Sequence, residues 1–314
     1  MKKFLRAMAI MLSAAFVCVA FVWVVLPEKM TAVLLTLNNA SAGLSAKIVK
    51  TELGNIHYLE GGQGETIVLI HGIYARKEHW VDLARHLTED YHVIAIDLPG
   101  FGDNETLRDN QYLIGRQQIN LLAVLDALDI DTAHIAANSM GAYVATLLAT
   151  ANPSRVSSFA FIGSPLGVPT RIKSDMDWAL ERGRKPLVAG SEPEFHARMA
   201  WLSPNPPYVP GPILNTWMNQ ELAMAQTNDR IWDVVHTQSK APTVLELAPE
   251  LTMKTLIIWC RPDRIFHVSG AKELAKRLKK QQLSILDQCG HVPMLDQPES
   301  VAAVYLAFLK TADQ

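Results

Sequence analysis

Hydrophobic and polar positions alternate along most of the chain in the manner of an α/β protein. After residue 47, short runs rich in β-branched residues alternate with longer stretches of helical periodicity, which is typical of βα units around a mostly parallel sheet. The turn pair Gly54-Asn55 predicts that the first two strands form an antiparallel hairpin. Helices are predicted at residues 79–87, 112–128, 140–151, 269–279 and 299–309. Eight strands are predicted, at residues 47–53, 56–60, 66–70, 92–96, 132–136, 156–162, 255–260 and 282–286.

The alternation stops between Gly163 and Met253. Four of the seven tryptophans and a proline-dense segment fall in this part of the chain. Because a structureless loop of about 90 residues is improbable in a compact domain, residues 163–252 are predicted to be a mainly helical cap inserted after the sixth strand. The sheet domain then consists of residues 47–162 and 253–314.

The N-terminus carries the longest apolar run of the chain. Residues 7–26 contain no charged side chain and follow Lys2, Lys3 and Arg6. As a helix this run would be about 30 Å long, which matches the hydrocarbon core of a bilayer. We therefore expect residues 1–26 to be a single-pass membrane anchor, with the N-terminus in the cytoplasm and the remainder of the chain on the periplasmic or extracytoplasmic side. A cleaved signal peptide and a secreted protein are the alternative, and lipid attachment at Cys18 is a weaker one.

Residues 27–46 link the apolar run to the first strand. Their leucine and valine side chains recur at about helical spacing. We expect a short helix here and favour one that packs on the main domain over one that lies on a membrane surface.

Composition excludes several classes of protein. The 314 residues are 49% hydrophobic and 19% charged, which is too apolar for a disordered chain. Lysine and arginine (29) are fewer than aspartate and glutamate (31). No nucleic-acid partner is expected, because phosphate binding needs an excess of basic side chains. The three cysteines have no metal-ligand spacing, so no metal site is expected either.

Ser139 is the candidate nucleophile. It lies in Ala137-Asn138-Ser139-Met140-Gly141, between an apolar strand and a helix. A serine with small neighbours at this junction is typical of a nucleophile elbow, a sharp turn that exposes the hydroxyl group. A serine in such a turn is by itself more often structural, but the strand before it and the helix after it favour a nucleophile.

A serine hydroxyl needs a general base that is itself oriented by an acid. In this architecture the partners follow the serine in the order acid, histidine, after later strands of the sheet. Asp263 follows the seventh predicted strand and His291 follows the eighth. We therefore expect Ser139, Asp263 and His291 to form a catalytic triad, with Asp287 and Asp296 as reserve candidates for the acid.

The backbone amides of Ile73 and Met140 are expected to form an oxyanion hole. Ile73 follows the end of the third predicted strand and Met140 follows the serine. Two such donors stabilise the negative charge of a tetrahedral intermediate. The loop of residues 97–102 is interpreted as structural, because its aspartate precedes the serine.

These motifs together resemble the α/β-hydrolase family, over residues 50 to 310. They look like those of bacterial lipases and esterases akin to membrane-anchored monoacylglycerol lipases. The resemblance implies an α/β-hydrolase fold with an eight-stranded, mostly parallel sheet flanked by helices, a cap over the active site, an acyl-enzyme mechanism and no cofactor. The sequence departs from the family pattern at Ala137 and Cys260, where relatives tend to have glycine. The motifs are HGIYARKEHW, DLPGFGDN, NSMGA, RPDRIF and CGHVPMLDQPE.

The expected function is the hydrolysis of lipid-like carboxylic esters through an acyl-enzyme on Ser139, with His291 as the base. The expected partners are a small acyl ester and, through the N-terminal segment, membrane lipid. Two alternatives stay open: a carbon–carbon bond hydrolase of ring-cleavage products, which the residues around Ser139 also resemble, and a non-catalytic binding protein of the same fold. Some apolar cap residues are expected to line an acyl pocket and more than half to pack the cap: Met176, Trp178, Phe195, Met199, Trp201, Trp217 and Met218.

Cys260 and Cys289 are expected at the ends of neighbouring strands. Outside the cytoplasm they could form a disulfide. Two buried thiols are the simpler interpretation.

Overall fold

An eight-stranded sheet forms the centre of the molecule, in the order β1-β2-β4-β3-β5-β6-β7-β8. β1 and β2 pair antiparallel, as do β2 and β4, and all other neighbours are parallel. A computed structural model describes residues 2–236 and 241–312, without the side chains of residues 2, 7, 14–21, 24 and 312. The strands are β1 (Leu44–Thr51), β2 (Gly54–Gly61), β3 (Thr66–Ile70), β4 (His92–Ile96), β5 (Ala133–Asn138), β6 (Val156–Pro165), β7 (Lys254–Cys260) and β8 (Gln281–Leu286).

The predicted fold class and the opening hairpin are confirmed, with corrections to the bounds of every predicted strand except β3 and β4. The hairpin turn is Glu52-Leu53 and not Gly54-Asn55, because Thr51 already pairs with Gly54 and its hydroxyl accepts the backbone N–H of Leu53. β1 begins at residue 44, inside the predicted linker. β6 continues to residue 165, inside the predicted cap.

Both faces of the sheet are covered by helices, which explains the continuous apolar runs of its parallel strands. In β3, Val68 and Ile70 face one hydrophobic core, and Ile67 and Leu69 face the other; all four are 0% exposed. The first core includes side chains of α4 (Ile114–Ala127), α5 (Ser139–Ala151) and α11 (Ser269–Arg277). The second includes side chains of α3 (Val81–Ala84) and α13 (Pro298–Ala312).

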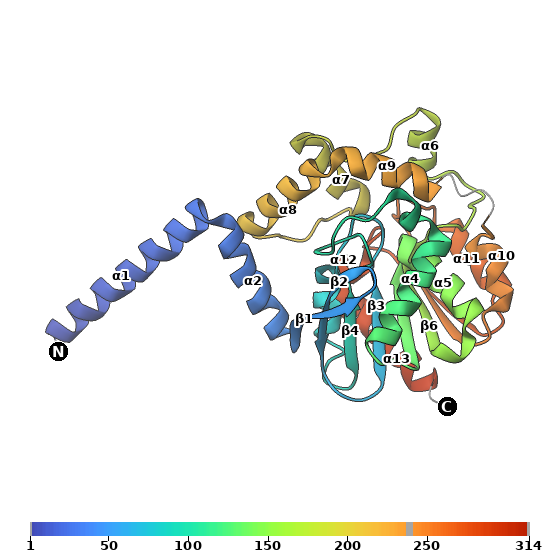
Figure 1. Cartoon of the computed structure of the whole chain (residues 1–314), viewed down its shortest axis with the longest axis horizontal. Helices are drawn as coiled ribbons and strands as arrows, with labels where there is room; N and C mark the ends of the chain where they lie inside the picture. The colour runs from blue at the N-terminus through green and yellow to red at the C-terminus, as the bar shows by residue number, and fades with distance from the viewer. Residues whose placement is uncertain (1, 237–240, 313–314) are drawn as a thin grey trace.

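The segment between β6 and β7 is helical, as expected. Figure 1 shows its first helices above the sheet, in olive to orange, opposite the C-terminus. Its first helix starts at a capping box, in which Ser174 and Asp177 bond each other's backbone N–H groups. Its helices are α6 (Asp175–Glu181), α7 (Glu192–Leu202), α8 (Gly211–Ala223), α9 (Ala225–His236) and α10 (Val244–Leu247).

Two helices precede the sheet. α1 (Lys2–Val25) projects away from the body of the molecule, whereas α2 (Pro27–Ser41) lies beside α8 of the cap (Figure 1). The hydroxyl groups of Thr31 and Thr216 are 3.0 Å apart across this contact. α2 is the short helix expected here; it packs on the cap through α8 and on the sheet domain through β1, and its Asn38 accepts a hydrogen bond from Arg85 at 3.0 Å.

The predicted membrane anchor is not confirmed. In the described part of the chain, no helix has both the length and the apolarity needed to cross a bilayer. Residues 14–21 of the predicted anchor, Cys18 among them, have side chains outside the described set.

Candidate active site

Ser139 lies where β5 ends and α5 begins, the position predicted for a nucleophile elbow. Its φ angle is +53°, in the left-handed region that non-glycine residues rarely adopt. The elbow packs closely against the residues that follow β3, and each of the two segments has a glycine at the contact. A Cβ on Gly141 would lie 2.1 Å from the carbonyl oxygen of His71, and a Cβ on Gly72 would lie 2.9 Å from Ser139 Cβ. Ala137 is fully buried in β5, so the departure from glycine leaves the turn intact.

The structure brings Asp263 to His291. His291 Nδ1 is 3.2 Å from Asp263 Oδ2, and the two side chains are 3% and 0% exposed. Asp263 Oδ1 accepts the backbone N–H groups of Ile265 at 2.8 Å and Phe266 at 3.2 Å, which fix the carboxylate. Ser139 and His291 line one cavity. The three residues proposed for the triad therefore converge at the carboxyl ends of their strands.

Neither reserve acid bonds the ring of His291. Asp287 is exposed and pairs with Arg261 at 2.7 Å. Asp296 accepts the backbone N–H of Gly290 at 2.6 Å, and burial raises its pKa. Both carboxylates therefore bond residues of loops near His291, whereas the carboxylate that bonds the His291 ring is that of Asp263.

Ser164 was missed by the sequence analysis. Its hydroxyl oxygen is 2.8 Å from His291 Nδ1 and 2.5 Å from Asp263 Oδ2. The predicted strand ended before it. One feature of the sequence could have identified Ser164: it is a polar residue at the carboxyl end of the strand that follows Ser139, and functional side chains of α/β sheets gather at such ends.

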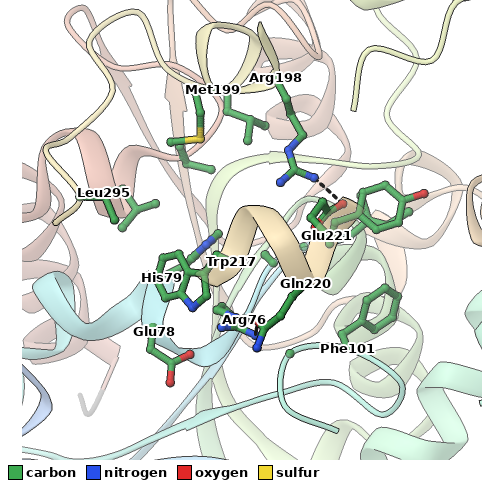
Figure 2. A pocket seen from close by; sticks show the side chains of 18 of the residues that line it. Arg76, Glu78, His79, Phe101, Arg198, Met199, Trp217, Gln220, Glu221 and Leu295 are labelled. Carbon is green, nitrogen blue, oxygen red and sulfur yellow. Dashed lines mark hydrogen bonds and ion pairs between the residues drawn. The ribbon is translucent and has the colours of Figure 1, made fainter. Parts of the chain in front are cut away.

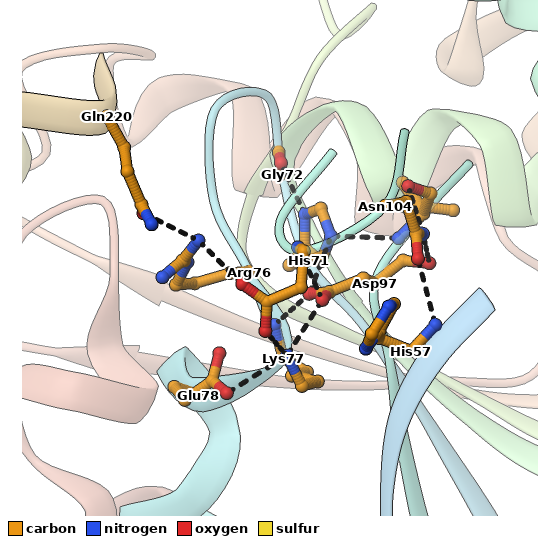
Figure 3. Close-up of polar contacts among 11 residues, drawn as sticks. His57, His71, Gly72, Arg76, Lys77, Glu78, Asp97, Asn104 and Gln220 are labelled. Atoms are coloured by element: carbon orange, nitrogen blue, oxygen red, sulfur yellow. Dashed lines mark hydrogen bonds and ion pairs between the residues drawn. The ribbon is translucent and has the colours of Figure 1, made fainter. Parts of the chain in front are cut away.

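The two predicted oxyanion-hole residues occupy suitable places. Met140 follows Ser139 in the first turn of α5, where backbone N–H groups have no partner within the helix. Ile73 lines the cavity beside Gly72. His71 holds this loop: its Nε2 accepts the backbone N–H of Leu98 at 2.9 Å, and its Nδ1 lies 2.7 Å from the carbonyl oxygen of Gly72 (Figure 3). Burial lowers the pKa of His71, so a neutral ring with its proton on Nδ1 satisfies both contacts.

Asp97 has the structural role that was expected for its loop. Its carboxylate bonds the ammonium group of Lys77 at 2.9 Å and lies 3.9 Å from Nε2 of His71, whereas His291 is bonded by Asp263 (Figure 3). Burial alone would lower the pKa of Lys77, but the carboxylates of Asp97, Glu78 and Asp103 outweigh it and raise that pKa. The ion cluster holds the loop that carries Ile73 against the end of β4.

The cavity has a volume of about 560 Å³ and lies between the sheet domain and the cap. Of the seven apolar cap residues considered for it, Phe195, Met199 and Trp217 line the cavity, and the other four lie outside its lining. Met176, for example, packs in the core of the cap with Trp232. Trp201 packs against the same core, whereas Trp178 is 48% exposed, so the expectation that more than half of these residues pack the cap stays a prediction.

Polar groups of α7, α8 and the loop after β3 also line the cavity. Arg198 and Glu221 form a largely buried ion pair at 2.7 Å. The Arg76 guanidinium lies 5.0 Å from the centre of the Trp217 ring and reaches toward Gln220 (Figure 2). The cavity thus combines apolar walls with a few polar groups, which is typical of a site for a small molecule.

Cys260 and Cys289 are joined in a disulfide, with Cα atoms 5.4 Å apart. The simpler interpretation, two separate thiols, is therefore wrong. Parallel pairing brings the end of β7 beside the end of β8. The bond ties the strand before Asp263 to the loop before His291.

A parallel sheet with a helical cap, a serine at a left-handed elbow and a buried histidine–carboxylate pair define the class of α/β hydrolases. Residues 67–304 match the α/β hydrolase family, and the chain belongs to that family.

Several proteins similar to this chain are lipases. The chain is 26% identical to lipase 1 of Psychrobacter immobilis, over 83% of this chain and 80% of that one. It is 24% identical to mouse monoacylglycerol lipase ABHD6, over 79% and 76% of the two chains. The crystal structure of a membrane phospholipase A superposes with a TM-score of 0.88 and 34% identity over 100% of both chains. The predicted enzyme class, a carboxylic ester hydrolase, agrees with these relatives.

Proposed function

We propose that the protein is a serine esterase that hydrolyses carboxylic esters of lipid-like substrates, with monoacylglycerols among the candidates. One observation carries the proposal: Ser139, at a left-handed elbow, and His291, bonded to Asp263, line the same largely apolar cavity. The names of the relatives support an ester bond in a lipid as the target.

The proposed reaction uses only side chains and amides of this chain. With Nδ1 of His291 bonded to its buried partners, Nε2 is left to take the proton of the Ser139 hydroxyl. The serine oxygen attacks the ester carbonyl, and the amides of Ile73 and Met140 stabilise the oxyanion. His291 returns the proton to the departing alcohol. It then activates a water molecule that releases the acid from Ser139.

The two other hypotheses have weaker support. A 2-hydroxy-6-oxo-6-phenylhexa-2,4-dienoate hydrolase from Rhodococcus superposes with a TM-score of 0.69 at 23% identity, and a likeness at that level concerns the fold alone. A non-catalytic binding protein has no need to keep a serine at an elbow and a histidine bonded to a buried carboxylate beside one cavity.

We propose further that α1 attaches the enzyme to a membrane, with the sheet domain on the extracytoplasmic side. Apolar side chains that stand free of the domain favour contact with lipid. The disulfide supports an oxidising compartment for the domain. Among the side chains of α1 that the structure describes, the most exposed apolar ones are Phe4 (72%), Ile10 (70%), Met11 (65%) and Leu12 (64%).

Membrane attachment is tested by fractionation of cells that produce the whole chain. We expect the protein in the membrane fraction, and Ile10→Glu with Leu12→Glu to shift it toward the aqueous fraction. Ile119→Glu with Ile172→Glu is the matched control, since these isoleucines are also exposed but lie on the domain. Equal behaviour of the two double variants would refute the role of α1.

The esterase is tested with purified protein and p-nitrophenyl and glycerol esters of increasing acyl length. Ser139→Ala is expected to abolish turnover, and Ser158→Ala, a buried serine at the far end of β6, to retain it. Activity that survives in Ser139→Ala would end the assignment of the nucleophile. An optimum at two to four acyl carbons would replace the lipid-like substrate by a short ester.

A further inference from the structure

The ring of His291 has a closer neighbour than Asp263. Its Nδ1 lies 2.8 Å from the hydroxyl oxygen of Ser164 and 3.2 Å from Asp263 Oδ2. The same hydroxyl is 2.5 Å from Asp263 Oδ2, and Ser164 is fully buried. His291 Nδ1, Ser164 Oγ and Asp263 Oδ2 therefore form a triangle, and its two shortest sides are the ones that meet at Ser164 Oγ.

One assignment of protons satisfies this triangle. An ionised carboxylate only accepts, so the Ser164 hydroxyl donates its proton to Asp263 Oδ2. A lone pair of Ser164 Oγ then accepts the Nδ1 proton of His291. The other oxygen of Asp263 already accepts two backbone N–H groups. The hydroxyl dipole thus has its positive end toward the carboxylate and its negative end toward the imidazole ring.

Several contacts fix Ser164 at this point. The backbone N–H of Leu166 donates to the carbonyl oxygen of Ser139 at 3.1 Å, which ties the end of β6 to the elbow. The side-chain amide of Asn138 donates to the carbonyl oxygens of Ile162 at 2.8 Å and His291 at 3.0 Å. Gly163 has a φ angle of +83°, and a Cβ there would lie 2.6 Å from the carbonyl oxygen of His291. Strand, elbow and histidine loop therefore meet with Ser164 between them.

We propose that Ser164 is a positioning residue of the esterase reaction, a claim that rests on the proposed function. It orients the imidazole ring of His291 and stabilises the imidazolium ion that forms when Ser139 loses its proton. It is absent from the lining of the cavity, so it acts through His291 and Asp263 rather than on the substrate.

The proposal predicts a specific kinetic signature for Ser164→Ala. A hydrogen bond to a charged group is lost in the transition state, and we expect kcat to fall roughly 10-fold to 100-fold with KM unchanged. The titratable groups that face His291 are Asp263 and Asp296, and both stay in place. Because the negative end of the hydroxyl dipole is removed from the ring, the midpoint of the acidic limb of the kcat/KM–pH profile should move to lower pH.

Two further variants separate positioning from a merely structural effect. Ser158→Ala removes a hydroxyl group from the same strand at the same burial, 2.8 Å from a ring nitrogen of His134, away from the candidate site. It should leave kcat and the pH profile unchanged. Ser164→Thr keeps the hydroxyl group and should recover most of the lost kcat. Urea unfolding of all variants identifies any that fails to fold.

The possible failures are distinguishable. If the wild type turns over no ester, or Ser139→Ala remains active, the proposed function fails. If the wild type is active and Ser139→Ala is not, but Ser164→Ala keeps the wild-type kcat and pH profile, the role of Ser164 is refuted alone. A folded Ser164→Thr that recovers nothing would refute it as well.

Discussion

The ammonium group of Lys77 lies 2.9 Å from Asp97 Oδ2, and the two side chains are 3% and 0% exposed. Asp97 also accepts the backbone N–H groups of Lys77 at 2.7 Å and Asp103 at 3.0 Å. This buried pair connects the end of β4 to the loop that follows β3. Since that loop carries Ile73, the pair supports the candidate oxyanion hole from outside the cavity.

Lys77→Met is expected to lower the free energy of unfolding by about 3–5 kcal/mol, because it leaves the carboxylate of Asp97 buried without its ammonium partner. Urea unfolding measures the loss. Lys47→Met is the matched control: Lys47 pairs with Glu60 at 2.7 Å but is 50% exposed, and solvent screens the pair. Equal losses in the two variants would contradict the argument from burial.

The disulfide makes a second prediction about stability. It closes a loop over a sequence separation of 29 residues, for which chain entropy predicts about 3–4 kcal/mol of stabilisation. We expect Cys260→Ala with Cys289→Ala, or reduction of the wild type, to lower the free energy of unfolding by that amount. Thiol titration of the denatured, unreduced chain should find one of the three cysteines free. Three free thiols would show that the bond does not form in the isolated protein.

The elbow tolerates no side chain at Gly141. A Cβ there would lie 2.1 Å from the carbonyl oxygen of His71, so Gly141→Ala must push α5 away from β3. We expect this variant to lose ester hydrolysis and to unfold at lower urea concentration. Gly115→Ala, in α4, is the control: nothing lies within 4 Å of its Cβ, and alanine should raise helix stability by about 0.5–1 kcal/mol. Wild-type activity in Gly141→Ala would contradict the close contact.

Two histidines predict loss of stability in acid: His71, which is fully buried, and His79, which is half-buried at the cavity. Burial lowers the pKa of His71, and lowers that of His79 to about 3. Unfolding raises both toward 6.5, so the unfolded chain binds more protons below that pH. Their contribution is complete above about pH 6.5 and is lost as the pH falls toward 3.

We expect the free energy of unfolding to decline over this range, and His79→Gln to reduce the slope by up to about 1.4 kcal/mol per pH unit. His196→Gln, on the exposed surface of α7, is the control and should leave the slope unchanged. Unfolding in urea at pH 7, 6 and 5 is the measurement. A slope that His79→Gln leaves intact would assign the acid sensitivity to other groups.

The sequence was most informative where burial is uniform and least informative where a contact joins distant segments. β3 and β4 have their predicted bounds, because fully buried strands are continuous apolar runs between polar ends. The helix predicted at residues 79–87 is instead a short 3₁₀ turn at Lys77–Trp80 followed by α3, with Lys77 held by Asp97, and periodicity carries no sign of that bond. Chain order located Asp263 and His291, but Ser164 belongs to no motif, and its role follows from three strand ends meeting in space.

Met199 offers a test of where an acyl chain binds. Its side chain lines the cavity from cap helix α7, next to Arg198 of the same helix (Figure 2). Met199→Trp adds bulk there, and each methylene group of an acyl chain that is excluded loses about 0.8 kcal/mol of burial. Exclusion of two methylene groups should lower kcat/KM for long-chain esters about 10-fold, with short-chain esters unaffected. Met218→Trp, in α8 but outside the lining, should change neither. Equal loss for short and long esters in Met199→Trp would place the acyl chain elsewhere in the cavity.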